Sequence, residues 1–115
     1  MATTLVDIKE VYNETIADIT SDSRKWQSFL SCASKNYKYD FDEQLLIYAQ
    51  RPTAIACASY DTWNSKLNRI IKKGHSGIAL ITEKYGKPSI RYVWDVSDTQ
   101  SMYGRKGKKV RVWNV

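Results

Sequence analysis

Cationic side chains are interleaved with aromatic side chains between residues 60 and 73. The set contains two rings and four cations: Tyr60, Trp63, Lys66, Arg69, Lys72 and Lys73. Lysine and arginine contact phosphates, and flat rings stack on unpaired nucleic-acid bases at about 1–3 kcal/mol per base. The combination is typical of proteins that bind single strands without reading their sequence. We therefore predict a polyanion-binding surface in this segment.

A second group of the same kind follows along the chain. Tyr85 and Tyr92 accompany Lys84, Lys87 and Arg91, in a segment with the pattern of a β-hairpin. Rings and cations on such a hairpin extend the predicted surface. The alternative for each lysine is a solvated position on a turn, where it improves solubility only.

The positive charge is concentrated in the second half of the chain. Of the 115 residues, the first 22 hold one lysine against five acids, a balance of −4. Residues 62–115 hold twelve Lys and Arg against three acids, a balance of +9. A localised basic surface of this kind favours a polyanionic partner.

Three helical patterns occupy the first half of the chain. Apolar residues recur at three- and four-residue steps in the first: Leu5, Ile8, Tyr12, Ile16 and Ile19. Residues 21–23 offer caps for a second helix that ends near Asn36. Asp40 and Glu43 form the pattern of a capping box for a third helix, which ends before Pro52.

The second half of the chain favours strands. After a short fourth helix around Trp63, residues 78–82 and 89–96 are rich in β-branched and aromatic residues. Residues 84–88 have turn chemistry, which predicts an antiparallel hairpin, and a third strand is expected at residues 110–115. Helices followed by strands predict an α+β fold, with N-terminal helices packed on a small antiparallel β-sheet. The length suits one domain over residues 1–115.

An ordered series of landmarks runs through the chain beyond the first helix. Its members are Trp26-x-x-Phe29-Leu30, residues 44–52, Trp63, residues 71–74, residues 77–80, residues 92–99 and Trp113. The series resembles the N-terminal domain of ArdC-type antirestriction proteins. The version that it resembles begins large helicase- or primase-like proteins of conjugative elements in Gram-positive bacteria.

The resemblance implies a non-catalytic domain that binds single-stranded DNA without strong sequence preference. Such a domain serves the transfer or protection of a mobile genetic element, in the cytoplasm and within a longer parent protein that has further domains. Beyond the six residues named first, the DNA-binding candidates are Gln44, Tyr48, Arg51, Lys84 and Arg91. Glu43 departs from the family, whose members often carry asparagine there, and it is expected to weaken the contact with DNA.

The metallopeptidase-like half of the ArdC family is absent from this sequence. No His-Glu-x-x-His motif occurs, and His75 is the only histidine, so we expect no zinc, no cofactor and no enzymatic activity. Asp95 and Asp98 leave one enzymatic alternative open, a magnesium-dependent nuclease. The competing interpretation of these residues is a turn that ends a strand, with His75 as an exposed turn residue.

A different class of function also stays open, a protein-interaction module that docks the parent protein onto transfer machinery. An exposed apolar patch at Tyr48, Ile55 and Tyr60 would favour it.

The sequence shows neither a secretory signal nor an apolar run long enough for a membrane, which predicts a cytoplasmic protein with no membrane partner. Cys32 and Cys57 are accordingly expected to be reduced. Trp26, Trp63 and Trp94 fall at core spacing, so burial competes with base stacking for each of them.

Overall fold

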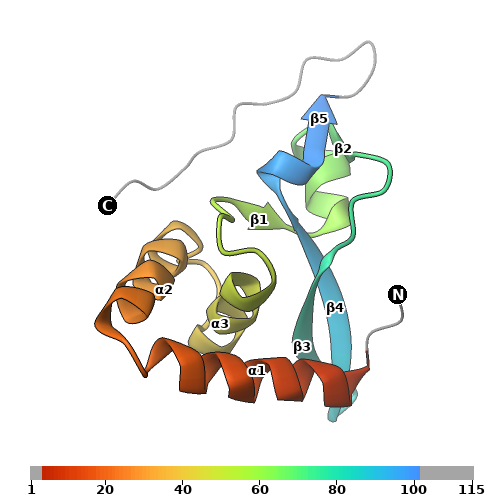
Figure 1. Ribbon diagram of the computed structural model, residues 1–115. Coiled ribbons are helices and arrows are strands. Elements are labelled where there is room, and N and C mark those ends of the chain that lie inside the picture. Colours follow the sequence, from red (N-terminus) through yellow and green to blue (C-terminus); the bar gives the residue numbers. More distant parts are fainter. Residues whose placement is uncertain (1–3, 102–115) are drawn as a thin grey trace.

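The computed structural model describes residues 4–101, and its architecture is the predicted α+β fold (Figure 1). Three helices lead: α1 (Leu5–Ile19), α2 (Ser23–Lys35) and α3 (Phe41–Gln50). Five strands follow: β1 (Cys57–Ala58), β2 (Arg69–Ile71), β3 (Ile78–Lys84), β4 (Lys87–Asp95) and β5 (Thr99–Ser101). The strand expected at residues 110–115 lies outside the described residues.

Side-chain caps begin the helices where the sequence predicts them. Asp22 accepts from the Arg24 amide at the start of α2, at 2.7 Å. At the start of α3, Asp40 Oδ1 accepts from the Glu43 amide at 2.9 Å and Glu43 Oε1 accepts from the Asp40 amide at 3.3 Å. The predicted capping box is therefore confirmed, and α3 ends at Gln50, just before Pro52.

The predicted hairpin is formed by β3 and β4, which pair from Ile78 with Val93 to Lys84 with Lys87. The two turn residues, Tyr85 and Gly86, have φ values of 53° and 75°. Two left-handed residues in succession are the requirement of the tight turn that matches the twist of a hairpin.

Three short strands complete the sheets, and the sequence patterns did not reveal them. β1 pairs with the other edge of β4, which gives the order β1-β4-β3. β2 and β5 form a separate antiparallel pair, in which Ile71 lies opposite Thr99. The predicted fourth helix is a turn of helix around η1 (Thr62–Lys66), with π-type geometry in which the Leu67 amide donates to the Thr62 carbonyl at 3.2 Å.

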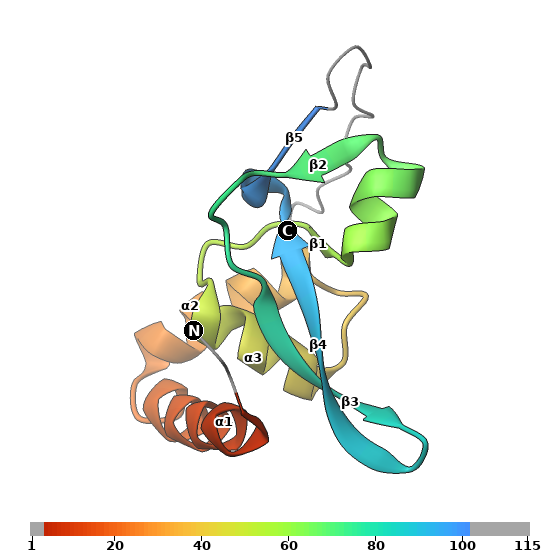
Figure 2. The same ribbon diagram turned by 90° about the vertical axis from the view of Figure 1, so that its right-hand side faces the viewer.

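The core lies between the helices and the twisted hairpin. α1 and α3 pack against β3, and Figure 2 shows the helices gathered on one side of the hairpin. The larger group of buried residues spans helices and strands: Ile8, Cys32, Leu46, Ile47, Ala54, Ile78, Ala79, Leu80 and Val93. A smaller group joins the three helices: Ile19, Phe29 and Leu45. No helix within residues 4–101 is both long enough and apolar enough to cross a bilayer.

Candidate nucleic-acid interface

Three aromatic side chains form a partly open surface on β4 and on the turn of helix before η1. Tyr60 is 52% exposed and Tyr92 is 42% exposed, while Trp94 lies half-buried between them. The Trp94 ring is 6.4 Å from that of Tyr60 and 6.5 Å from that of Tyr92, measured between centroids. We call these three residues the aromatic surface.

The pleat of β4 explains why these rings are open. Alternate residues of a strand face opposite sides, and the side chains of Val93 and Asp95 are the ones that point into the protein. Gly77 leaves room for the rings on the other face. A Cβ atom there would lie 2.9 Å from the Tyr92 Cβ and 3.0 Å from the Trp94 ring.

Hydrogen bonds hold the central ring of the aromatic surface in place. The Trp94 indole nitrogen donates to the His75 carbonyl at 3.2 Å, which ties the loop after β2 to the ring. The Trp94 carbonyl accepts from the indole nitrogen of Trp63 at 2.9 Å. A surface fixed in this way loses little conformational entropy when a ligand binds.

Trp63 itself is a core residue and not a stacking residue. Its side chain is only 1% exposed, so neither face of the ring is open to a base. Its place among the DNA-binding candidates is therefore wrong, and core burial, the competing interpretation, is confirmed. Trp26 differs from that expectation, since its side chain is 37% exposed on α2.

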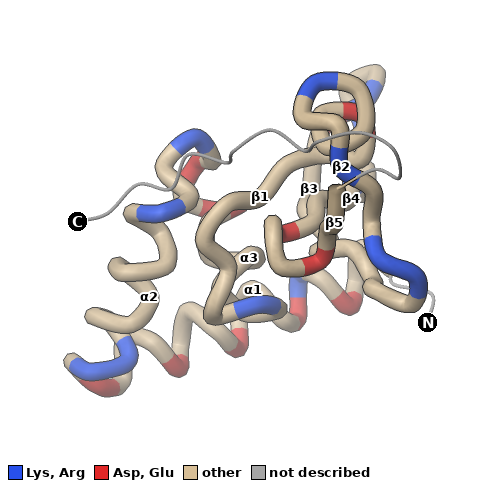
Figure 3. The backbone as a smooth tube through the Cα atoms, turned by 90° about the horizontal axis from the view of Figure 1, so that it is seen from above, with Lys and Arg blue, Asp and Glu red and all other residues tan. Residues whose placement is uncertain are grey.

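Three of the predicted lysines lie on the segments that adjoin the aromatic surface. Lys66 and Lys73 are exposed and form no ion pair with another described residue. Lys72 is half-buried and its ammonium donates to the Ser97 carbonyl at 3.2 Å. Figure 3 shows the wider separation of charge, with acids recurring along α1 and with lysines and arginines on α2 and on the loops near β2.

The three predicted arginines are engaged in contacts within the protein. Arg51 donates to Asp98 at 2.7 Å, and Arg69 donates to the Thr99 hydroxyl at 2.8 Å. Arg91 forms an ion pair with Glu43 and lies over the Tyr39 ring. Glu43 thus has two partners, its capping-box residue and this arginine. These arginines join distant elements of the fold and are not free phosphate ligands.

The remaining candidates lie apart from the aromatic surface. The side-chain amide of Gln44 donates to the carbonyl of Asn36 at 3.2 Å, and Tyr48 packs edge-on against Phe29. Both are helix-packing residues. Lys84 lies at the hairpin turn, where its ammonium is 5.9 Å from the ring of the fully exposed Tyr85. That pair forms a separate, smaller candidate for DNA contact.

The patch that would favour protein docking does not form at the predicted residues. Tyr48 and Ile55 are half-buried, and only Tyr60 is exposed. Tyr60 points into the aromatic surface instead.

Asp95 ends β4 and caps the turn η2 (Val96–Asp98), and both Asp95 and Asp98 accept several hydrogen bonds there. Asp95 accepts from the amides of Ile55 and Ala56 at 2.8 and 3.0 Å, and from the Ser97 amide and hydroxyl at 3.1 and 2.6 Å. Within residues 4–101, no three His, Cys, Asp or Glu side chains are grouped as metal ligands. The geometry therefore favours the turn interpretation of these two carboxylates over a magnesium site.

Asp98 is a buried carboxylate that contacts Arg51 and the only histidine, both of them partly exposed. Its Oδ1 accepts from Arg51 at 2.7 Å and lies 2.8 Å from His75 Nδ1, and its side chain is 1% exposed. His75 is exposed in the loop after β2, as expected, and its ring also contacts Asp98, which anchors that loop. Burial alone would raise the pKa of Asp98, but the hydrogen bonds from His75 and Arg51 outweigh it and hold that pKa below its ordinary value.

Replacing Asp98 with asparagine is expected to lower the free energy of unfolding by about 2 kcal/mol at pH 7, because Arg51 loses a charged partner. A carboxyl with a lowered pKa adds stability above its unfolded-state pKa of about 3.9, and loses it as the pH falls through the folded-state pKa. The difference between the two proteins should therefore narrow as the pH is lowered from 7 towards about 2. Urea unfolding at several pH values measures this. Asp61→Asn is the exposed control, and a difference that stays constant with pH would contradict the role of the charge.

In comparisons with known proteins, no family model, no curated protein and no solved structure matches the chain. The resemblance to ArdC-type proteins therefore rests on the landmark residues of the sequence alone.

Proposed function

We propose that this chain is a non-catalytic domain that binds single-stranded DNA, with little sequence preference, in a mobile-element protein of conjugative transfer or antirestriction. The observation that carries the proposal is the aromatic surface, where Tyr60 and Tyr92 stand open on either side of the fixed Trp94 ring. Open rings beside cations suit unpaired bases and their phosphates.

Charge and position support a path for the phosphates beside the rings. The loop that carries Lys72 and Lys73 is tied to Trp94 through the His75 carbonyl. Lys66 ends the helical turn that starts near Tyr60. Lysine neutralises phosphates as a flexible point charge, which requires no fixed base sequence. The resulting surface selects single strands because the bases of a duplex are stacked on one another and leave no face for a protein ring.

Titrating the full chain with a labelled single strand and with the matching duplex, each at two salt concentrations, tests the proposal. We expect tighter binding of the single strand, and a steep loss of affinity with salt because phosphate contacts release counterions. Equal affinity for both forms would contradict the stacking of bases on the rings. Absence of binding at low salt would overturn the proposed function altogether.

A second candidate function is docking to a protein, within the parent protein or onto transfer machinery. Its specific observation is an apolar group on α2 and at the start of α3. Trp26, Leu30 and Phe41 are 37%, 46% and 45% exposed. Trp26 and Phe41 both contact the buried Phe29 ring, each at 5.6 Å between centroids. Failure of the DNA titration would make this group the next candidate for a binding surface.

A further inference from the structure

On the edge of β3 that faces away from β4, the backbone groups of one residue are hydrogen-bonded, and those of residues further along the strand are free to pair. The hydrogen-bonded residue is Ala79, and its partner is the side chain of Gln50. The Gln50 amide oxygen accepts from the Ala79 backbone amide at 2.9 Å, and the Gln50 amide nitrogen donates to the Ala79 carbonyl at 2.8 Å. The backbone groups of Ala79 thus point away from β4. Because this direction alternates along a strand, those of Ile81 and Glu83 point the same way.

The backbone groups of Ile81 and Glu83 have no partner at that edge among the described residues. The register supports this assignment, since Glu83 lies opposite Pro88, which has no N–H to donate to β3. Two N–H and two C=O groups are therefore available to pair with a further strand. An open edge of this kind is a template for strand addition.

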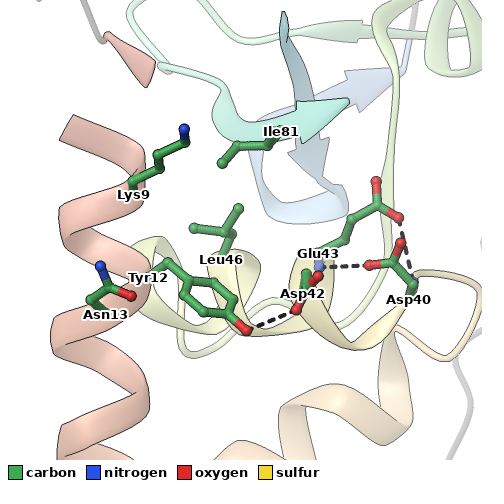
Figure 4. A pocket seen from close by; sticks show the side chains of 8 residues that line it. All are labelled: Lys9, Tyr12, Asn13, Asp40, Asp42, Glu43, Leu46 and Ile81. Carbon is green, nitrogen blue, oxygen red and sulfur yellow. Dashed lines mark hydrogen bonds between the residues drawn. The ribbon is translucent and has the colours of Figure 1, made fainter. Parts of the chain in front are cut away.

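A groove runs beside this open edge. One part, about 430 Å³ in volume, lies between α1, α3 and β3 (Figure 4). A second part, about 560 Å³ in volume, continues past Thr82 and Glu83 to the hairpin turn at Gly86 and Pro88. Asp40, Glu43 and Ile81 line both parts, so the two are continuous. We call the whole the edge groove.

The lining of the edge groove is acidic around an apolar base. Four carboxylates line it, one of which, Glu43, is paired with Arg91: Asp40, Asp42, Glu43 and Glu83. Lys9 is the one cation among the lining residues, and Ile81 and the ring of Tyr12 supply the apolar contact. Such a surface repels DNA and attracts cations, so its occupant differs from that of the aromatic surface.

We propose that the edge groove binds an extended segment of a partner protein, in which lysine or arginine alternates with apolar residues, as an added strand on β3. The backbone of the segment pairs with Ile81 and Glu83. Its apolar side chains contact Ile81 and the ring of Tyr12, and its cations meet the carboxylates of the groove. A second copy of this chain is not the occupant, because pairing two β3 edges would bring two sets of four carboxylates together.

The direct test is amide hydrogen exchange on the full chain, with a synthetic peptide of four Lys-Val repeats as the probe. Exchange at Ile81 and Glu83 should slow at least about tenfold when the peptide is bound, because both amides gain an acceptor. The same peptide with alternate backbone nitrogens methylated keeps its charge and loses donors, and it should bind about tenfold more weakly. Unchanged exchange at the two amides, equal binding of both peptides, or no binding overturns the proposal.

Two matched double variants separate the groove from charge in general. Asp42→Asn with Glu83→Gln should weaken binding of the Lys-Val peptide about fivefold, since two carboxylates of the groove are lost. The fold should persist, because an asparagine oxygen at residue 42 can still accept from the Tyr12 hydroxyl. Glu14→Gln with Asp61→Asn removes the same charge from exposed residues outside the groove and should change binding less than about twofold. Equal losses in both double variants would overturn the proposal.

Discussion

Replacing Trp63 with alanine is expected to lower the free energy of unfolding by about 3–5 kcal/mol, the range for removing a buried aromatic side chain. The ring is 1% exposed and lies beneath the aromatic surface, where its indole nitrogen donates to the Trp94 carbonyl at 2.9 Å. The variant thus loses apolar burial and leaves that carbonyl without its side-chain partner. Thermal or urea unfolding followed by circular dichroism measures the effect.

Trp26→Ala is the matched control, because it removes the same side chain from a position that is 37% exposed. Its ring packs against Phe29 but stays partly exposed, so a loss of about 1 kcal/mol is expected. DNA binding by the Trp63 variant should fall only in proportion to the unfolded fraction. If the Trp63 variant is as stable as the Trp26 variant but has lost its affinity for DNA, Trp63 is a DNA-binding residue after all.

Local sequence patterns predicted the large elements of this fold well. The caps at Asp22 and Asp40 and the stop before Pro52 are local signals, and each marks an end of a helix in the structure. β1, β2 and β5 were missed because they are two or three residues long and their partners are distant. Cys57, for example, pairs with Asp95. No periodicity develops over so short a run.

The candidate site was predicted in outline and not in detail. Period-two alternation identifies the two faces of β4, but it does not say which one is buried. Burial of Val93 and Asp95 decides this through contacts from other elements. The role of Arg51 depends on Asp98, which is 47 positions away along the chain. A sequence pattern contains only residue types and their spacing, whereas a contact between distant residues, such as Arg51 with Asp98, forms only in the folded chain.

The largest expected effect on DNA binding comes from removing both open rings, in the double variant Tyr60→Ala with Tyr92→Ala. If each ring stacks on one base at about 1–3 kcal/mol, affinity for a single strand should fall at least about 30-fold. The slope of log affinity against log salt should stay nearly unchanged, because an uncharged ring releases no counterion. The fold should persist, since both side chains are exposed and, among the described residues, the Tyr60 hydroxyl accepts only from the side chain of Asn64.

Two further variants make the result specific to the aromatic surface. Tyr85→Ala removes a tyrosine that is 94% exposed at the hairpin turn, outside the aromatic surface, and should reduce affinity far less than the double variant does, because its pair with Lys84 is the smaller candidate contact. Lys72→Ala with Lys73→Ala should reduce affinity for all sequences alike and lower the salt slope by about 0.7 for each lost phosphate contact. Rings and cations thereby produce different signatures in one titration. A Tyr85 variant that binds as weakly as the Tyr60 and Tyr92 variant would move the site to the hairpin turn, where Lys84 lies against the Tyr85 ring.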